Sequence, residues 1–265
     1  MSKTKVVHRI ISGEIDNASK FARLNYYECK TCKSLFKVGA QFWKLNFATR
    51  PDYYFNGYRS GHVFGRPILK NSPRINNWSR HISGFYGDTN SVKILDMGCA
   101  EGYLVLALRD LGFNAFGIEP NPAMCNYATL VLGINKENIK QSNYEVKSFD
   151  AETFDAISSY HTIEHCPSPH SILINAFTHL KKGGLLFLST PSAEASVNEL
   201  TYSGRNLNFV DSHDFLLSHD AIESIASSIG FEIIGKHDFD KEMAVIGIDP
   251  QGEKEEGMNY VFKKP

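Results

Sequence analysis

The stretch Ile94-Leu95-Asp96-Met97-Gly98-Cys99-Ala100-Glu101-Gly102 decides the fold of this 265-residue chain. Its apolar beginning predicts a buried strand, and its glycines predict a tight turn at the end of that strand. Directly after the turn, apolar residues recur at helical spacing at Leu104, Ala107, Leu108 and Leu111. A helix that packs one face on a sheet is therefore expected, with Gly112 as its stop.

The alternation of a predicted strand with a predicted helix continues toward the end of the chain. Strands are expected near residues 92–97, 114–119, 138–141, 154–160, 185–189, 231–236 and 260–263, and helices from Asn121-Pro122, over 171–180 with an end at Gly183-Gly184, and over 220–230. Strands separated by helices indicate parallel units of a doubly wound sheet. We expect an α/β, Rossmann-like fold over residues 91–265, mostly parallel with a C-terminal antiparallel strand. Residues 1–90 fit no such pattern and are expected to form a helical or irregular extension.

Charge is distributed unevenly along the chain. Residues 1–82 contain 15 Lys and Arg against 4 Asp and Glu, and the remainder contains 13 against 25, for a net charge of −1. This asymmetry indicates either an anionic partner or a basic and an acidic half of the protein that pack against each other across an interface. We expect the basic extension to act as a lid or substrate-binding region that holds a phosphate or carboxylate. Its aromatic rings and arginines also suit single-stranded RNA, but a pI near 6.8 argues against nucleic acid.

The sequence has no feature of a secreted or membrane-spanning protein. Its N-terminus lacks the apolar core of a signal peptide, and no run of about 18 apolar residues is present. The 5 cysteines are an odd number for a disulfide framework. Cys29 and Cys32 have the spacing of half a zinc site, but only His62 or His81 could complete four ligands, so a structural pair is expected. We expect a cytoplasmic protein of unknown oligomeric state.

The glycine turn also predicts a ligand. In an open α/β sheet, ligands bind beyond the carboxyl ends of the strands. A dinucleotide site carries G-x-G-x-x-G, whereas this turn has small residues at Gly98, Ala100 and Gly102. Asp96 at the same edge favours a cationic group over a pyrophosphate. Glu119, at the end of the next strand, can accept hydrogen bonds from both hydroxyls of a ribose.

Four segments together resemble class I S-adenosylmethionine-dependent methyltransferases of the broad small-molecule group. They are residues 94–102, Ile118-Glu119-Pro120-Asn121, residues 154–157 leading into Glu164-His165-Cys166-Pro167-Ser168-Pro169, and Leu180-Lys181-Lys182-Gly183-Gly184. The resemblance covers about residues 94–234 and implies S-adenosylmethionine as the cofactor. It implies that Asp96, Gly98 and Gly102 cradle the methionine end, that Glu119 holds the ribose and that Asn143 meets the adenine.

Further cofactor contacts are expected beside these motifs, at Cys99, Ala100, Tyr103, Pro120 and Tyr160. Relatives usually have Asp at the position of Asn143 and favour Gly at that of Ala100.

The catalytic candidates follow the fourth predicted strand, in Tyr160-His161-Thr162-Ile163-Glu164-His165. Histidine is well suited to take a proton from a hydroxyl near neutral pH. His161 is the first candidate for the base and His165 the second, although in many relatives Glu164-His165 only braces the next helix. His213 is the third, because its segment resembles a substrate-facing insertion. A divalent metal on His161, Glu164 and His165 is an alternative, but these residues lie so close in sequence that no metal is expected.

The function expected from these features is transfer of a methyl group from S-adenosylmethionine to an oxygen of a small polar acceptor. The basic first 82 residues favour an anionic acceptor, such as a nucleotide-activated sugar or a polysaccharide precursor. A quinone- or phenol-type acceptor, an RNA or protein substrate, and a cofactor-binding subunit without catalysis remain as alternatives.

Overall fold

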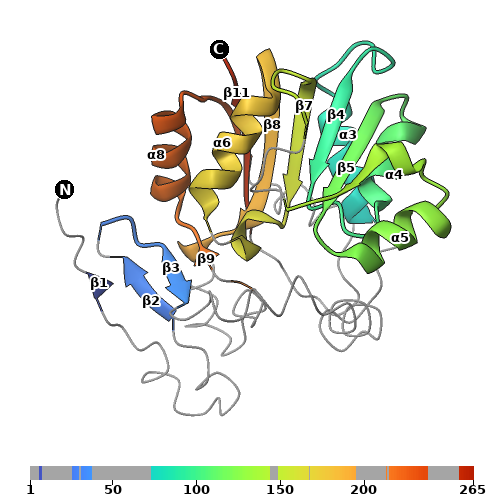
Figure 1. Ribbon diagram of the computed structural model, residues 1–265. Helices are drawn as coiled ribbons and strands as arrows, with labels where there is room; N and C mark the ends of the chain where they lie inside the picture. The colour runs from blue at the N-terminus through green and yellow to red at the C-terminus, as the bar shows by residue number, and fades with distance from the viewer. Residues whose placement is uncertain are drawn as a thin grey trace.

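A computed structural model of the chain describes residues 6–7, 26–29, 31–37, 73–143, 149–166, 168–194, 213, 215–237 and 257–265. Within these residues the strands form one seven-stranded sheet and one four-stranded sheet (Figure 1). None of the helices in this part of the chain is long and apolar enough to cross a membrane.

The large sheet has the strand order β10-β11-β8-β7-β4-β5-β6. Its strands are β4 (Lys93–Met97), β5 (Asn114–Glu119), β6 (Ile139–Gln141), β7 (Phe154–Tyr160), β8 (Leu180–Pro191), β10 (Glu232–His237) and β11 (Gly257–Lys263). Strands β6, β5, β4, β7 and β8 run parallel, and β11 is antiparallel to both of its neighbours, β8 and β10. The predicted Rossmann-like α/β sheet with a C-terminal antiparallel strand is confirmed.

Helices cover both faces of this sheet. They are α3 (Pro73–Ser83), α4 (Tyr103–Asp110), α5 (Pro122–Leu130), α6 (Pro169–His179) and α8 (His219–Ile229), with the short 3₁₀ helices η2 (Lys136–Asn138) and η3 (Ile163–His165). Successive residues of a strand point to opposite faces, so Ile94 of β4 joins the apolar core under α3, α4 and α5, whereas Leu95 joins the core under α6 and α8. Figure 1 shows α6 next to β8, with α8 beside α6.

One predicted boundary is wrong. The helix expected to end at Gly183-Gly184 ends at His179, and β8 begins at Leu180, which pairs with Phe154. The two glycines lie inside the strand because they pair with the C-terminus: Gly183 N–H donates to the Lys264 carbonyl at 2.7 Å, and Lys264 N–H donates to Gly184 at 2.9 Å. Gly183 has a φ of +78° at the bulge where the register of β7 and β8 shifts.

The small sheet joins the extension to the C-terminal half of the chain. Its strands are β1 (Val6–Val7), β2 (Tyr26–Cys29), β3 (Leu35–Lys37) and β9 (Phe215–Leu216), all paired antiparallel in that order. Beside the β3–β9 pair, Ser218 N–H donates to Ser34 Oγ at 2.9 Å. Ser218 is also the N-cap of α8, since its hydroxyl accepts from Ala221 N–H.

Helix α3 precedes the boundary that we expected at residue 90. It buries Trp78 and Ile82 against the core of the large sheet, and the indole Nε1–H of Trp78 donates to Ser158 Oγ of β7 at 3.0 Å. The division of the chain at residue 90 stays a prediction.

Candidate active site

The turn between β4 and α4 has an unusual backbone. Gly98, Ala100 and Gly102 have φ angles of +82°, +45° and +86°, in the left-handed region that favours glycine. At Gly98 a Cβ atom would lie 2.4 Å from Thr162 Oγ1, so glycine is required by packing as well as by conformation. Ala100 takes the same conformation with a Cβ, which explains why relatives favour glycine there. The turn is fixed to β5 because Gly98 N–H donates to the Ile118 carbonyl at 2.9 Å.

Glu119 closes the turn from the end of β5. Its Oε2 accepts from Ala100 N–H at 3.1 Å, and its Oε1 accepts from Asn121 N–H at 2.9 Å. The side chain is buried, with half-buried Pro120 next in the chain. Burial raises the pKa of Glu119 to about 7, although the two amides act against this shift. Glu119 is thus a buried carboxylate that two backbone amides hold in place beside the glycine turn.

Asp96, the other predicted carboxylate, is buried at the end of β4. Burial raises its pKa to about 7; a hydrogen bond from Ser158 lowers the pKa and the charge of Glu119 raises it. Ser158 accepts the indole hydrogen of Trp78, so helix α3 helps to fix the hydroxyl that faces Asp96. Sequence reasoning placed Trp78 in the expected lid and missed its contact with Ser158, since nothing in a single sequence shows that residues 80 positions apart meet.

The remaining predicted cofactor residues surround these carboxylates at various depths. Cys99 and Tyr103 are buried, and the hydroxyl of Tyr103 lies 3.0 Å from that of Tyr127. Tyr160, at the end of β7, is half-buried. Asn143 is exposed after β6, and the preceding Ser142 N–H donates to the Glu119 carbonyl at 3.2 Å, which keeps Asn143 near the β5 end.

The catalytic candidates gather around one carboxylate, Glu164 in η3. Nδ1 of His161 lies 3.4 Å from Glu164 Oε1, and Nε2 of His165 lies 4.0 Å from the same oxygen. His213 reaches the cluster from the segment before β9, with its ring centroid 4.8 Å from that of His165. Glu164 is fully buried, and its Oε2 accepts from Thr190 Oγ1 at 2.9 Å. Thr190 and the central position of Glu164 were missed, because the sequence does not show which residue the histidines share.

Glu164 differs from the carboxylates of the glycine turn in its protonation. Burial by itself would raise its pKa, but the contact with His161 and the charges of His165, His161 and His213 outweigh burial and lower the pKa to about 2. At 3.4 Å, the contact of His161 Nδ1 with Glu164 Oε1 is not a well-formed hydrogen bond, and Oε1 has no hydrogen-bond partner among the described residues. The lowered pKa keeps Glu164 ionised at neutral pH.

The backbone presents His161 in a strained conformation. It has a φ of +49°, rare for a residue with a side chain. Its N–H donates to the Ser189 carbonyl of β8 at 2.9 Å, and its ring lies 4.7 Å from that of Tyr160. Strain of this kind is often found where a side chain must take one direction for function.

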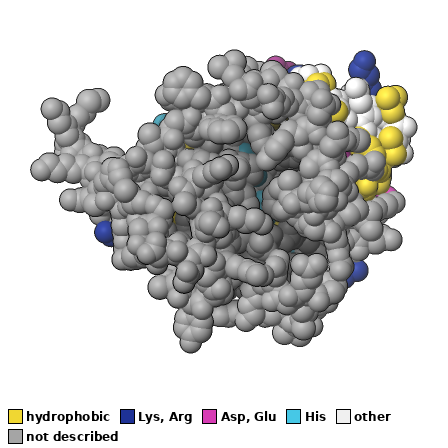
Figure 2. Space-filling model, turned by 90° about the horizontal axis from the view of Figure 1, so that it is seen from below, with side chains coloured by type: hydrophobic (Ala, Val, Ile, Leu, Met, Phe, Trp, Pro, Cys, Tyr) yellow, Lys and Arg dark blue, Asp and Glu magenta, His cyan; other side chains and the backbone are white. Residues whose placement is uncertain are grey.

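Both clusters lie at the carboxyl edge of the large sheet. The arrowheads of β4, β5 and β7 point to the lower edge in Figure 1, where η3 and β9 also lie. Viewed from below, described histidine side chains are visible near the middle of this face (Figure 2). The structure thus brings the predicted cofactor and catalytic residues to one edge.

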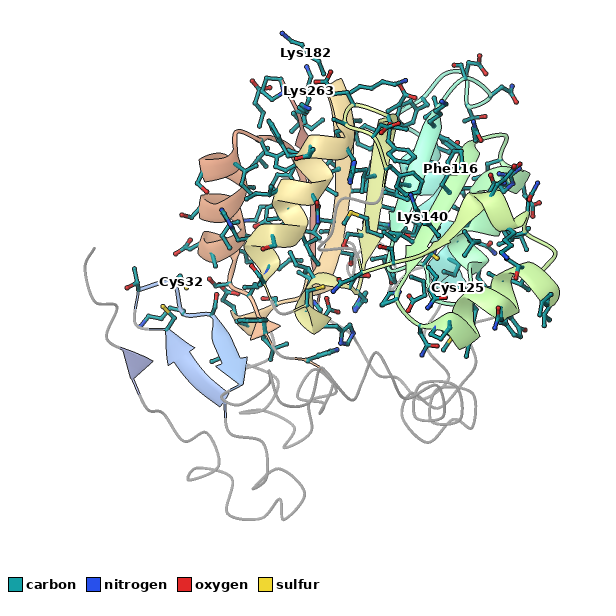
Figure 3. All side chains as sticks on the ribbon, in the orientation of Figure 1. Cys32, Phe116, Cys125, Lys140, Lys182 and Lys263 are labelled. Atoms are coloured by element: carbon teal, nitrogen blue, oxygen red, sulfur yellow. The ribbon has the colours of Figure 1, made fainter. Side chains whose placement is uncertain are left out.

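The pair Cys29 and Cys32 lies elsewhere. Cys29 is the last residue of β2 and Cys32 lies in the turn between β2 and β3, and Figure 3 places Cys32 beside the small sheet and Cys125 on the far side of the large one. A backbone hydrogen bond from Cys32 lowers the pKa of the Cys29 thiol against the effect of burial. Of the expected zinc partners, His81 packs its ring on Trp78. His62 lies outside the described residues. Of the basic, aromatic segment 50–82 that we expected to form a lid, residues 50–72 also lie outside them, and residues 73–82 belong to α3, which buries Trp78 in the core.

The sequence profile of a family described as "Methyltransferase domain" matches residues 61–236, most of the chain and both clusters. The chain belongs to this family. It carries a class I S-adenosylmethionine-dependent methyltransferase domain.

Two relatives of this methyltransferase are ubiquinone biosynthesis O-methyltransferases. That of Colwellia psychrerythraea is 29% identical over 157 residues, which are 58% of this chain and 60% of the relative. That of Glaesserella parasuis is 32% identical over 147 residues, which are 52% of this chain and 61% of the relative. The matches therefore span about three fifths of each relative's length.

A solved S-adenosylmethionine-dependent methyltransferase from Mesorhizobium loti has a similar fold. It superposes with a TM-score of 0.55 over 71% of this chain and 97% of that one, at 12% sequence identity. This likeness supports the fold and says nothing of the acceptor.

The cofactor of the methyltransferase is S-adenosylmethionine, and the residues at the glycine turn fit it. This cofactor carries positive charge on its sulfonium and its ammonium, and Asp96 and Glu119 supply two buried carboxylates. Asn121 Nδ2 is buried without a hydrogen-bond partner among the described residues, so a donor remains for a ligand. No pyrophosphate would be favoured beside this negative charge.

Proposed function

We propose that this methyltransferase transfers the methyl group to the hydroxyl of a phenolic, quinone-type acceptor. The observation that carries the proposal is the His161–Glu164 pair at 3.4 Å, at the same sheet edge as the glycine turn. The two ubiquinone biosynthesis O-methyltransferases point to the same class of acceptor. Our first choice from the sequence, an anionic or nucleotide-activated sugar, rested on the basic extension, most of which lies outside the described residues.

The proposed proton transfer uses both partners of the pair. The Glu164 carboxylate draws the Nδ1–H of a neutral His161 toward itself, which leaves Nε2 of that ring as the proton acceptor. An acceptor hydroxyl would then lose its proton to Nε2 as its oxygen bonds to the methyl carbon, while the bond from that carbon to sulfur breaks and leaves a neutral thioether; Glu164 would stabilise the resulting imidazolium. When bound, S-adenosylmethionine supplies an electrophilic methyl group.

The two clusters are in direct contact, which would hold acceptor and cofactor in register. Thr162 follows His161 in the chain and packs on Gly98 of the glycine turn, so movement of one cluster shifts the other. The rings of Tyr160 and Trp78, with centroids 5.1 Å apart, pack together, and the Tyr160 ring also lies against His161. Fixed positions and exclusion of water are the main contributions that a methyltransferase makes to rate.

The acceptor class is tested by mass spectrometry of reactions that contain S-adenosylmethionine and one candidate acceptor. The acceptors are a catechol, a monophenol and a nucleotide-linked uronic acid, each at the same concentration. We expect a methyl ether on the catechol or monophenol and none on the uronic acid. Methylation of the uronic acid alone would contradict the proposal and restore the sugar hypothesis.

The same proposal includes a small-molecule partner and a cytoplasmic setting. All 5 cysteines are free thiols, as a reducing compartment requires.

A further inference from the structure

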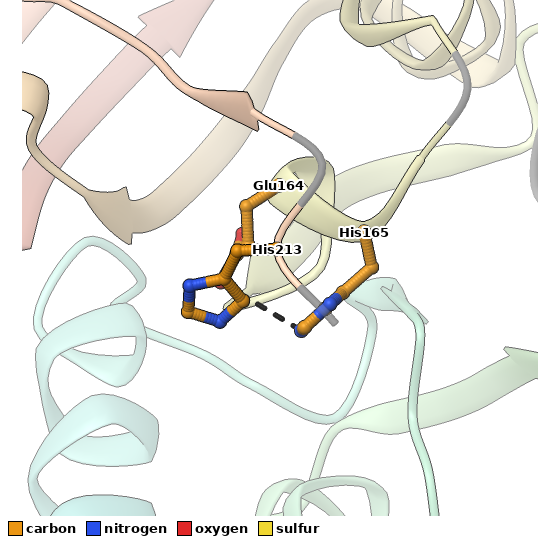
Figure 4. A group of neighbouring side chains, drawn as sticks. All are labelled: Glu164, His165 and His213. Atoms are coloured by element: carbon orange, nitrogen blue, oxygen red, sulfur yellow. Dashed lines mark ion pairs between the residues drawn. The ribbon is translucent and has the colours of Figure 1, made fainter. Parts of the chain in front are cut away.

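Three side chains of the histidine cluster converge on one point from two distant segments of the chain. Glu164 and His165 belong to η3, and His213 lies just before β9, which packs beside η3. One ligand atom from each lies within 4.8 Å of the other two (Figure 4). The β9 segment is held by the hydrogen bond from Ala193 N–H to the Leu217 carbonyl at 2.9 Å, so both segments rest on the end of β8.

The carboxylate at the centre is suited to a cation. Glu164 is fully buried, and its Oε1 has no hydrogen-bond partner among the described residues. A buried carboxylate oxygen that lacks a hydrogen bond is costly, and a coordinated metal ion would remove that cost. Its other oxygen accepts from Thr190 at 2.9 Å, the kind of contact that orients a ligating carboxylate from behind.

The two histidines are placed to share one ion. The ring centroids of His165 and His213 lie 4.8 Å apart, and the ligand atoms of both rings lie within 4.8 Å of a Glu164 oxygen. Imidazole nitrogen and carboxylate oxygen are common ligands of first-row transition metals. A single ion between the three side chains is therefore within reach of all of them.

We infer that Glu164, His165 and His213 bind one divalent first-row transition metal ion, such as Zn²⁺ or Co²⁺. Two imidazoles and one carboxylate are the ligands of such ions, whereas Mg²⁺ and Ca²⁺ prefer oxygen alone. Metal–ligand bonds of about 2.1 Å place ligand atoms roughly 3 to 3.5 Å apart, so the side chains close by about 1 to 2 Å on binding. The sequence expectation of no metal considered His161, Glu164 and His165; the structure replaces His161 with His213.

Three protein ligands leave coordination positions open, as in catalytic rather than structural sites. These positions could take two neighbouring oxygens of a catechol, with His161 beside them as the base. This role rests on the proposed function, whereas binding of the metal does not.

The test is titration of metal-free protein with Co²⁺, followed by visible absorption, with Zn²⁺ competition for the affinity. We expect one equivalent bound by histidine and carboxylate ligands, and binding about 100-fold weaker in His213→Ala and in Glu164→Gln. Exposed His170, in the first turn of α6, provides the matched control, and His170→Ala should bind as the wild type does. A Cys29→Ser variant should also retain the ion, because thiolates are not among the ligands.

Retained S-adenosylmethionine affinity shows that each variant is folded. If either variant fails this check, His165→Ala replaces it. The side chain of His165 is 16% exposed, whereas that of Glu164 is fully buried, so its removal should disturb the core less. The absence of stoichiometric Co²⁺ binding, or equal binding by His213→Ala and wild type, would overturn the inference. Binding of Co²⁺ by a protein that methylates no phenol would refute the acceptor class alone, and phenol methylation without Co²⁺ binding would refute the metal site alone.

Discussion

Two clusters of buried carboxylates lie at the same edge of one sheet, and they differ in charge. At the glycine turn, burial raises the pKa of Asp96 and of Glu119 to about 7. At the end of β7, Glu164 is just as buried, yet its pKa is lowered to about 2 by the histidines around it. Burial is the same in both places, so the neighbours decide the protonation state.

The difference indicates what each cluster lacks. The glycine-turn cluster has acidic groups and no described basic side chain in contact with them, and its missing cation is the cofactor. In the histidine cluster, the neighbouring histidines lower the pKa of Glu164 and keep this carboxylate ionised, which suits a group that must orient a base or a metal. Substitutions and changes of pH can disturb one cluster at a time, or the contact between the two clusters.

The largest effect is expected from His161→Ala, which removes the proposed base and leaves the glycine turn intact. Turnover should fall by about 100- to 1,000-fold, the usual contribution of general base catalysis. Affinity for S-adenosylmethionine should not change. Steady-state kinetics and calorimetry measure the two quantities, and His170→Ala is the control. Unchanged turnover would move the role of base to His165 or His213.

The next effect concerns the contact between the clusters. Gly98→Ala adds a Cβ 2.4 Å from Thr162 Oγ1 at a φ of +82°, and should lower the free energy of unfolding by about 3 kcal/mol. Gly133→Ala has a φ of +70° but no atom within 4 Å of the added Cβ, so it should cost only about 1 kcal/mol. Urea unfolding measures both. Equal losses would show that Thr162 does not press on the turn.

The third effect is the pH dependence of cofactor binding. Below about pH 7, Asp96 and Glu119 are largely protonated in the free enzyme, and a cationic ligand favours their ionised forms. Affinity for S-adenosylmethionine should therefore rise by up to about tenfold per pH unit as pH approaches 7, and then level off. Glu164 contributes no such slope in this range, because stability from its lowered pKa is lost only as pH falls below about 4.5 toward 2. Calorimetry from pH 5.5 to 8.5 checks the slope; a flat profile would contradict the raised pKa values.

The smallest effect is expected from Trp78→Phe. It removes the donor to Ser158 Oγ and should lower the free energy of unfolding by about 1 to 2 kcal/mol. Because Ser158 can then turn away from Asp96, the pKa of Asp96 should rise and the pH midpoint of cofactor binding should move up with it. Tyr86→Phe, which loses a hydrogen bond to the Asp155 carbonyl at 3.3 Å, is the control that should leave the midpoint unchanged.

The glycine turn could be predicted from the sequence because its determinants are local. The ends of two predicted strands and the small residues of the turn identify Gly98, Gly102 and Glu119, which lie within 21 positions of one another. The alternation of strands and helices predicts the sheet around them. The C-terminal strand was also predicted. The end of the helix before β8 was not, since Gly183 and Gly184 pair with Lys264 and take strand geometry from that distant partner.

The histidine cluster could be predicted only in part. His161 and His165 are near in sequence, but His213 is 48 residues beyond His165, and only the fold brings it to Glu164. The sequence therefore offered a metal on His161, Glu164 and His165 only as an alternative, and no metal was expected. The contact of Trp78 with Ser158 was missed for the same reason, because α3 reaches the sheet from a segment without strand and helix alternation.

The separate roles of the two clusters are tested most directly by calorimetric titration of S-adenosylmethionine into wild type, Glu119→Gln and Glu164→Gln. Each substitution replaces a buried carboxylate with an amide of the same shape. We predict that Glu119→Gln weakens binding by about 100-fold, because it loses charge-assisted contacts, whereas Glu164→Gln stays within about threefold of wild type. Equal loss of affinity in both variants, or loss in Glu164→Gln alone, would contradict the account.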